Sequence, residues 1–372
     1  MTTEIYLFDM DGVLLEPRGY HESLRASVKR IGSALGATHT DLADNQIAKF
    51  EALTVTNEWD TLAICTALIL LDIWRVNGKV RLDGIAPNTK VILDQKTDFD
   101  EFLATFEDVG NLPGHSCYQK IINDNPWLNN NQLDYLQHIL FNCRDIYQSP
   151  TLPIHQETVL GSQKFHETYD LNPKLDTQSY LLVHDRPIFN KNNQKIFNRW
   201  LRKSTNFAGI LTNRPSSTPP GYLSSPEAEL GAELIGLGDL PILGSGILAW
   251  YAKTQLVLPD YSLLKPNPVH TLALLQMCLG CSINEALYKA VRLWREEAAI
   301  ADWQALQRSA ITIFEDSTKG MYSGIEARDL LKKIGIDCQL NLIGVTNNPI
   351  KRHALKNVSD SILQNINNFE WL

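Results

Sequence analysis

The chain has 372 residues, more than one ordinary domain core needs, so its length predicts two structural units. A hydrophobic content of 44% and a charged content of 20% are typical of a globular protein. The net charge of -8 argues against nucleic acid and anionic membranes as main partners. The longest apolar run, Thr61 to Trp74, is interrupted by Asp72 and is too short to cross a bilayer, so we expect no membrane partner.

The first predicted element is a strand at residues 5–8, whose sequence IYLF is apolar without alternation. Such a run is typical of a strand buried on both faces of a parallel sheet. Asp9 and Asp11 follow directly, and Gly12 permits a tight turn. Two carboxylates at a strand end suggest a metal held by oxygen ligands and a carboxylate that can attack as a nucleophile. An ordinary strand-end turn is the alternative, because Asp and Gly are turn residues.

The insert that follows this strand, residues 17–186, is predicted to be mostly helical. After an expected loop at 15–20, apolar residues recur at helical spacing. The helices are expected at 21–36, 41–55, 57–77, 115–123, 130–147 and 155–169. The stretch 79–114 is rich in Asp, Pro, Asn and Gly and is expected to be irregular. Residues 180–183 carry the one strand signal. Because the first strand begins so close to the N-terminus, we expect no signal peptide and a cytoplasmic protein.

An α/β pattern begins near residue 187, where strands alternate with helices. Strands are expected at 207–212, 241–244, 310–314 and 338–345, and helices at 189–203, 227–236, 268–279, 282–298, 300–308 and 321–334. A last helix and a short strand close the chain. This alternation predicts an α/β fold with a doubly wound parallel sheet, to which the first strand also belongs. We expect residues 1–16 and 187–372 to form this domain and 17–186 to form a helical one.

Polar residues of complementary type follow four of these strands or the adjoining loops. They are Asp9 and Asp11, Thr212 and Asn213, Lys265, and Glu315 and Asp316. Because the carboxyl ends of parallel strands meet at one edge of a sheet, we expect these groups to face one crevice. Carboxylates from two strands can hold Mg²⁺, and a lysine and a hydroxyl can bind phosphoryl oxygens.

These motifs, in this order, resemble those of the haloacid dehalogenase-like (HAD) hydrolase superfamily. They read DMDGVL at 9–14, ILTN at 210–213, KPNP at 265–268 and FEDSTKG at 314–320. The resemblance covers about 1–16 and 187–372. It implies a Rossmann-like core, and a helical cap domain inserted after the first motif is also a common feature of that family. At 17–186 this cap is large for the family, and the stretches 79–114 and 282–308 have no counterpart in it.

The resemblance also implies a role for each matched residue. Asp9 would be the nucleophile that forms an aspartyl-phosphate and would also bind the metal. Asp11 would protonate the leaving group and activate water, and its main-chain carbonyl would touch the metal. Thr212, with Asn213, and Lys265 would bind the phosphoryl group. Asp316 would hold Mg²⁺, and Glu315 would do so directly or through water. Because the dehalogenase branch lacks the second aspartate of the first motif, Asp11 favours phosphoryl chemistry.

Residues near the start of the insert are candidates for substrate selection. Arg18, Tyr20 and His21 leave the sheet beside Asp9, and the Arg18 guanidinium could grip a second anionic group. A solvated surface arginine is the alternative for Arg18. Asn57 and Asp60, at the start of an apolar helix, lie in a segment that loosely resembles cap sequences of phosphatase-like members. Helix capping is the competing account for these two residues.

Two enzymes and one non-enzyme agree with this pattern. The leading hypothesis is a Mg²⁺-dependent phosphatase acting on a small phosphorylated metabolite. A phosphomutase of the same superfamily would use the same motifs, and nothing in the insert decides between them. A binding protein that kept the fold is the third alternative, against which Asp11 argues, because binding alone does not require that carboxylate. The sequence leaves open whether the chain forms a homo-oligomer.

Overall fold

A computed structural model describes residues 2–88, 92–94, 96–107, 112–220 and 222–371. The chain divides into two compact units. The sheet unit comprises Met1–Pro17 and Asp185–Leu372, and the helical unit comprises Arg18–His184. The sequence predicted the division one residue earlier on the first side and two residues later on the second. A short antiparallel pair lies beside both boundaries. It is formed by β2 (Leu15–Glu16), just before the chain leaves the sheet unit, and β3 (Arg186–Pro187), just after the chain returns to it.

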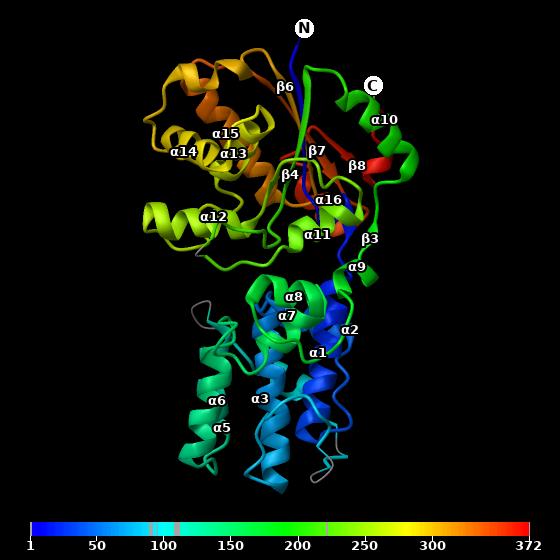
Figure 1. The fold of residues 1–372 in the computed structure, drawn as a ribbon, viewed down its shortest axis with the longest axis vertical. Coiled ribbons are helices and arrows are strands. Elements are labelled where there is room, and N and C mark those ends of the chain that lie inside the picture. The colour runs from blue at the N-terminus through cyan, green and yellow to red at the C-terminus, as the bar shows by residue number, and fades with distance from the viewer. Residues whose placement is uncertain (1, 89–91, 95, 108–111, 221, 372) are drawn as a thin grey trace. The chain divides into compact units, whose positions relative to one another are not determined.

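The sheet unit contains a six-stranded, wholly parallel sheet, so the predicted α/β class and parallel sheet are confirmed. Its strands are β1 (Glu4–Phe8), β4 (Asn206–Leu211), β5 (Ile242–Leu243), β6 (Ala310–Glu315), β7 (Gln339–Val345) and β8 (Ser361–Leu363). They lie in the order β5-β4-β1-β6-β7-β8, and Figure 1 labels β4, β6, β7 and β8 of this sheet. Along the chain, β4 and then β5 are added on one side of β1, and β6, β7 and β8 are added on the other side. The order therefore reverses between β1 and β6, the position where open α/β sheets bind ligands.

The central strand β1 is buried on both faces because helices cover both. Ile5 and Leu7 belong to one hydrophobic core, and Tyr6 and Phe8 belong to another. The first core is filled from α12 (Ser245–Tyr251), α13 (Pro268–Cys278), α14 (Ile283–Trp294), α15 (Thr318–Lys333) and α16 (Pro349–Leu355). The second is filled from α10 (Lys191–Leu201), α11 (Glu227–Leu234) and the C-terminal segment, and the Tyr6 ring stacks on Trp200 at 4.0 Å. An unalternating apolar strand is what this two-sided burial requires.

The helical unit has a hydrophobic core of its own. Its helices are α1 (Gly19–Leu35), α2 (Asp44–Ala52), α3 (Glu58–Val76), α4 (Phe99–Leu103), α5 (Pro113–Asp124), α6 (Asn130–Phe141), α7 (Leu152–Leu160), α8 (Ser162–Tyr169) and α9 (Tyr180–His184) (Figure 1). Helix α3 is buried along most of its length and packs against α1, α5, α6 and α7, as an all-round apolar helix must. Among the described residues, no helix combines the length and apolar character that crossing a bilayer requires.

Several predicted elements in the insert were wrong. Residues 180–183 form helix α9 instead of a strand, because Ser179 caps it and accepts the Leu182 N–H, while Leu182 and Val183 are exposed. A four-residue apolar run cannot by itself distinguish strand from helix. The predicted helix 155–169 is two helices, which break at Gly161 with φ of 81°. The expected loop 15–20 already contains β2 and the start of α1.

Further differences concern irregular segments and helices that were not predicted. Within 79–114 the structure adds α4, whose N-terminus is capped by the Asp98 carboxylate, while residues 89–91, 95 and 108–111 of that stretch lie outside the described residues. In the sheet unit the predicted helix 300–308 is a 3₁₀ helix, Ile300–Leu306. Helix α12 and the π-helical turn Ala252–Leu256 that extends it were not predicted.

Candidate active site

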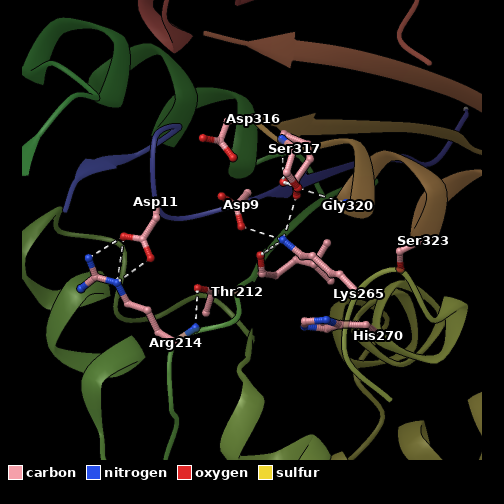
Figure 2. Close-up of polar contacts among 12 residues, drawn as sticks. Asp9, Asp11, Thr212, Arg214, Lys265, His270, Asp316, Ser317, Gly320 and Ser323 are labelled. Carbon is pink, nitrogen blue, oxygen red and sulfur yellow. Dashed lines mark hydrogen bonds and ion pairs between the residues drawn. The ribbon is translucent and has the colours of Figure 1, made fainter. Parts of the chain in front are cut away.

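A cavity of about 310 Å³ opens at the carboxyl ends of β1, β4 and β6. It lies at the edge where the strand order reverses. Its lining residues are Asp9, Asp11, Gly12, Pro17, Thr212, Asn213, Lys265, Glu315, Asp316, Ser317 and Lys351. All seven residues predicted from the strand ends are therefore brought to one cavity, and Figure 2 shows the side chains of Asp9, Asp11, Thr212, Lys265 and Asp316 around it.

Asp9 is positioned by the end of β1 and by the turn that follows it. Its backbone N–H donates to the carbonyl of Phe314 on β6 at 2.9 Å, so the strand ladder continues to the residue that bears the carboxylate. Gly12 then turns the chain with φ of +82°. A Cβ on Gly12 would lie 2.4 Å from Oδ2 of Asp316, so a side chain at this position would displace that carboxylate. Glycine is thus needed both for the backbone conformation and for the close approach of Asp316.

Lys265 lies between two carboxylates at the centre of the site (Figure 2). Its Nζ donates to Asp9 Oδ1 at 2.6 Å, to Glu315 Oε2 at 2.8 Å and to the backbone carbonyl of Leu211 at 2.9 Å. An ammonium group has three N–H donors, so these contacts use all of them. Lys265 therefore neutralises and orients Asp9, whereas the phosphoryl contact that the sequence predicted for it would require one of these hydrogen bonds to exchange.

The pKa values of this pair follow from burial and mutual charge. Burial raises the pKa of the Asp9 carboxyl group well above its ordinary value, and Glu315 adds to the shift while Lys265 opposes it. Burial alone would lower the pKa of Lys265, but the carboxylates of Asp9 and Glu315 outweigh it and raise that pKa. Lys265 therefore keeps its charge beside Asp9, and further positive charge nearby would favour the ionised form of Asp9.

Glu315 is held at the end of β6 by the start of α15. Its Oε1 accepts from the Ser317 hydroxyl at 2.7 Å and from the Ser317 N–H at 3.2 Å, while Oε2 accepts from Lys265. Ser317 also caps α15, because its Oγ accepts from the N–H of Gly320 at 3.2 Å. A Cβ on Gly320 would lie 2.1 Å from the Glu315 carboxyl carbon, so the glycine leaves the space that this buried carboxylate fills.

Asp9, Glu315 and Asp316 form a group that could hold a metal ion. Each offers one carboxylate oxygen, and these oxygens lie within 4.8 Å of one another. All-oxygen donor sets suit hard divalent cations such as Mg²⁺ and Ca²⁺, so the residues fit the predicted metal without singling out magnesium. Burial raises the pKa of the Asp316 carboxyl group, and hydrogen bonding to Lys351 opposes the shift. The Lys351 ammonium therefore already supplies a cation at this group.

A second buried cation, Arg214, holds Asp11. Its Nε donates to both carboxylate oxygens of Asp11 at 2.9 and 3.0 Å, and its Nη2 donates to Oδ1 at 2.5 Å (Figure 2). Nη2 also pairs with Asp185 at 2.9 Å. The side chains of Arg214 and Asp185 are buried, whereas that of Asp11 is 34% exposed. This planar fork fixes the plane of the Asp11 carboxylate while one side of it remains open to solvent.

Thr212 and Asn213 follow β4 at the wall of the cavity. The Thr212 hydroxyl oxygen accepts the backbone N–H of Arg214 at 3.1 Å, which fixes the position of the hydroxyl. Its own hydrogen can be donated to an anion in the cavity. The side chain of Thr212 thus suits the predicted contact with a phosphoryl oxygen, while for Asn213 the structure adds only its place in the lining.

The predicted substrate-selecting residues all lie in the helical unit. Arg18 is the N-cap residue of α1, Tyr20 and His21 follow in its first turn, and His21 Nε2 lies 3.1 Å from Glu51 Oε1. Their contact with a substrate stays a prediction.

Asn57 and Asp60 lie at the start of α3, and neither caps the helix as the competing account expected. The Asn57 side chain makes no cap hydrogen bond. Asp60 is buried and pairs instead with Arg144 at 2.7 Å. A role in substrate selection stays a prediction for these residues as well.

Four residues of the site were not predicted: Arg214, Asp185, Ser317 and Lys351. Arg214 immediately follows the motif ILTN and Ser317 lies within the motif FEDSTKG, so their positions in the sequence could have pointed to them. Asp185 and Lys351 carry no local signal, because their contacts join distant segments. Asp185 meets Arg214 where the chain returns to the sheet unit next to β3, and Lys351 meets Asp316 from the first turn of α16, which follows β7.

A larger cavity, about 380 Å³, lies within the helical unit and is lined by none of the predicted site residues. Its wall mixes charges of both signs, including Asp72, Arg75, Lys120 and Asp124. Its volume alone does not make it the site, because the side chains with complementary chemistry gather at the sheet edge.

Comparison with known proteins supports the fold. No protein-family model matches this sequence, and no curated protein matches it significantly. The chain is similar to an X-ray structure determined as a target of the Northeast Structural Genomics Consortium, with a TM-score of 0.64 and 16% sequence identity. The alignment covers 98% of this chain and 96% of that chain. At this identity the likeness shows that the two chains share a fold over nearly their whole length.

Proposed function

We propose that this protein is a Mg²⁺-dependent phosphatase that hydrolyses a small phosphorylated metabolite through an aspartyl-phosphate on Asp9. Its four motifs resemble those of the HAD hydrolase superfamily, and we propose membership of it. The observation that carries the proposal is the pairing of Asp9 with Lys265 at 2.6 Å, beside two further carboxylates and the Thr212 hydroxyl, where the strand order reverses. A nucleophile, a fixed cation, a hydroxyl donor and metal ligands are what phosphoryl transfer requires.

In the first step a carboxylate oxygen of Asp9 attacks the phosphorus atom of the substrate. The new O–P bond forms as the bond to the leaving oxygen breaks, and the electron pair of that bond stays on the leaving oxygen. Asp11 donates a proton to this oxygen, so the product departs as a neutral alcohol. Arg214 keeps the Asp11 carboxyl group in one plane, so that its open side is available to the leaving group.

In the second step a water molecule attacks the phosphorus atom of the acyl phosphate. Asp11, now ionised, accepts a proton from this water as the new O–P bond forms. The bond between Asp9 and phosphorus breaks, which regenerates the Asp9 carboxylate and releases inorganic phosphate. The exposure of Asp11 allows it to exchange its proton with solvent between turnovers.

The remaining residues stabilise charge. The Thr212 hydroxyl would donate to a phosphoryl oxygen, and Lys265 keeps Asp9 oriented and its negative charge balanced. Asp9, Glu315 and Asp316 would hold Mg²⁺, which offsets charge on the carboxylates and the phosphoryl oxygens when bound. These contributions need no movement of the sheet, because each residue is fixed at a strand end or in the adjoining loop.

A screen of phosphorylated metabolites with Mg²⁺, read by release of inorganic phosphate, tests the proposal. We expect at least one substrate to be hydrolysed, EDTA to remove the activity, and Mg²⁺ to restore it. The Asp9→Asn variant, prepared in parallel, is the control for contaminating phosphatases. Full activity in EDTA would show that the hydrolysis does not need a metal, and equal activity of the Asp9→Asn variant would show that the measured hydrolysis does not use Asp9.

A further inference from the structure

Lys351 is a second lysine of the cavity that neither the motifs nor the proposed mechanism uses. It lies in the first turn of α16, and its Nζ donates to Oδ2 of Asp316. The same side chain lines the cavity together with Asp9 and Thr212. One ammonium group therefore contacts a candidate metal ligand and also borders the space where a substrate would bind.

The two lysines of the site differ in how firmly they are held. Lys265 is 2% exposed, and its three donors are all engaged. Lys351 is 50% exposed, and among the described residues Asp316 is its one ion-pair partner. Its flexible four-carbon stem allows the ammonium to move without disturbing the fold. Lys265 is thus a fixed cation, and Lys351 is an exchangeable one.

Asp316 is the more buried partner of this pair. Its side chain is 13% exposed, against 50% for Lys351, and its Oδ2 occupies the space that the missing side chain of Gly12 leaves. The carboxylate therefore has less room to move than the ammonium. When the contact between Lys351 and Asp316 breaks, the lysine is the partner that moves.

Charge balance gives a reason for the contact to break. Asp9, Glu315 and Asp316 place three carboxylates within a few ångströms, and the two lysines offset part of that charge. A divalent cation bound by the same carboxylates would lie close to the Lys351 ammonium, and like charges at such a distance repel. The metal and Lys351 therefore compete for Asp316.

We propose that Lys351 is the resident counter-cation of Asp316, that a divalent metal displaces it, and that the released ammonium then contacts the anionic ligand in the cavity. This inference rests on the metal site of the proposed function. It makes two predictions of opposite sign: without Lys351 the metal should bind more tightly, and phosphate should bind less tightly to the metal-loaded protein. A variant that merely damages the site would weaken both.

The test compares Lys351→Met with Lys356→Met, which removes the same charge at the other end of α16, where Lys356 is exposed. Mn²⁺ affinity is measured by electron paramagnetic resonance of the unbound ion. Affinity for inorganic phosphate is measured by calorimetry in saturating Mg²⁺. We expect Lys351→Met to bind Mn²⁺ about fivefold more tightly and phosphate about fivefold more weakly, as for a partly exposed ion pair. Lys356→Met should match the unmodified protein in both measurements.

Unchanged or weaker Mn²⁺ binding by Lys351→Met would overturn the proposal, and weaker binding would make Lys351 an orienting partner of Asp316. Tighter Mn²⁺ binding with unchanged phosphate affinity would overturn the second half of the proposal, that the released Lys351 ammonium contacts the anionic ligand. An Asp316→Asn variant separates this inference from the proposed function. If the unmodified protein and Asp316→Asn bind Mn²⁺ equally, the metal site itself is wrong, whatever Lys351 does.

Discussion

Two buried cations, each placed between two carboxylates, hold the two aspartates that follow β1. Lys265 lies between Asp9 and Glu315, and Arg214 lies between Asp11 and Asp185. Both cations are buried, but their partners at the cavity differ: the side chain of Asp9 is 9% exposed and that of Asp11 is 34% exposed.

The difference matches the different demands on a nucleophile and on a proton donor. A nucleophile reacts best when few waters solvate its charge, and the buried ammonium of Lys265 neutralises Asp9 without bringing water to it, because its three donors all contact protein groups. Asp11 must reach both the leaving oxygen and the attacking water, since it gives a proton to one and takes a proton from the other, and the guanidinium of Arg214 orients Asp11 while leaving it accessible. In each pair, the contacts of the cation and the exposure of the carboxylate therefore suit the role proposed for that carboxylate.

The largest effect should come from the two aspartates themselves. Asp9→Asn should abolish turnover and leave no covalent phosphate on the protein, because an amide is a poor nucleophile. Asp11→Asn should lower kcat by about 10²- to 10⁴-fold, the usual contribution of general acid–base catalysis. With p-nitrophenyl phosphate, whose leaving group needs little protonation, intact-mass measurement should still detect phosphorylated Asp11→Asn protein. Residual turnover of a few per cent in Asp9→Asn would contradict covalent catalysis at that position.

The next effect concerns the stability that Lys265 provides. Lys265→Met leaves the buried carboxylates of Asp9 and Glu315 without their shared cation, and breaking a buried pair in this way costs about 3–5 kcal/mol. Urea unfolding of the metal-free protein should show this loss in the free energy of unfolding. Lys351→Met, which removes a half-exposed lysine from the same cavity, is the matched control and should lose less than about 1 kcal/mol. Equal losses in the free energy of unfolding would mean that the burial of Lys265 does not make it more important for stability than Lys351.

The smallest effect should come from changing the shape of the second cation while keeping its charge. Arg214→Lys retains a positive charge beside Asp11 but loses the planar fork that holds both carboxylate oxygens. We expect kcat to fall by about tenfold, in line with the loss of one charged hydrogen bond, while KM stays nearly unchanged. Steady-state kinetics with p-nitrophenyl phosphate and with a slower-leaving alkyl phosphate measure this. The loss should be greater for the alkyl phosphate, and a larger KM with unchanged kcat would instead assign Arg214 to substrate binding.

The sequence predicted the side of the cavity built from strand ends better than the side built from longer-range contacts. Asp9, Thr212 and Glu315 each follow a buried apolar strand, and parallel pairing then brings strand ends to one edge. Asp185 depends on the β2–β3 pair, whose two-residue strands are too short to give a periodic signal. The contact of Lys351 with Asp316 depends on how the start of α16 approaches the end of β6. Neither contact follows from local patterns of residues.

The helical unit shows the same limit. The long helices α1 and α3 were predicted because many turns repeat the apolar spacing. Helix α9 was mistaken for a strand because five residues contain too few turns to show a period. The substrate-selecting role of Arg18 stays a prediction, because the sequence gives its neighbours along the chain but not the groups it meets in space.

The pairing of β1 has a consequence for the order in which the chain folds. Glu4 pairs in register with Asn206 on one side and with Ala310 on the other, so the central strand of the sheet has no partner near it in the sequence. During synthesis β1 emerges before its partners, so it must wait for β4 and then for β6 before its ladder can close. The helical unit, whose core is drawn from its own residues, has no such delay. Because contacts between distant residues form slowly, we expect the helices to be folded while the strand that carries Asp9 is still unpaired.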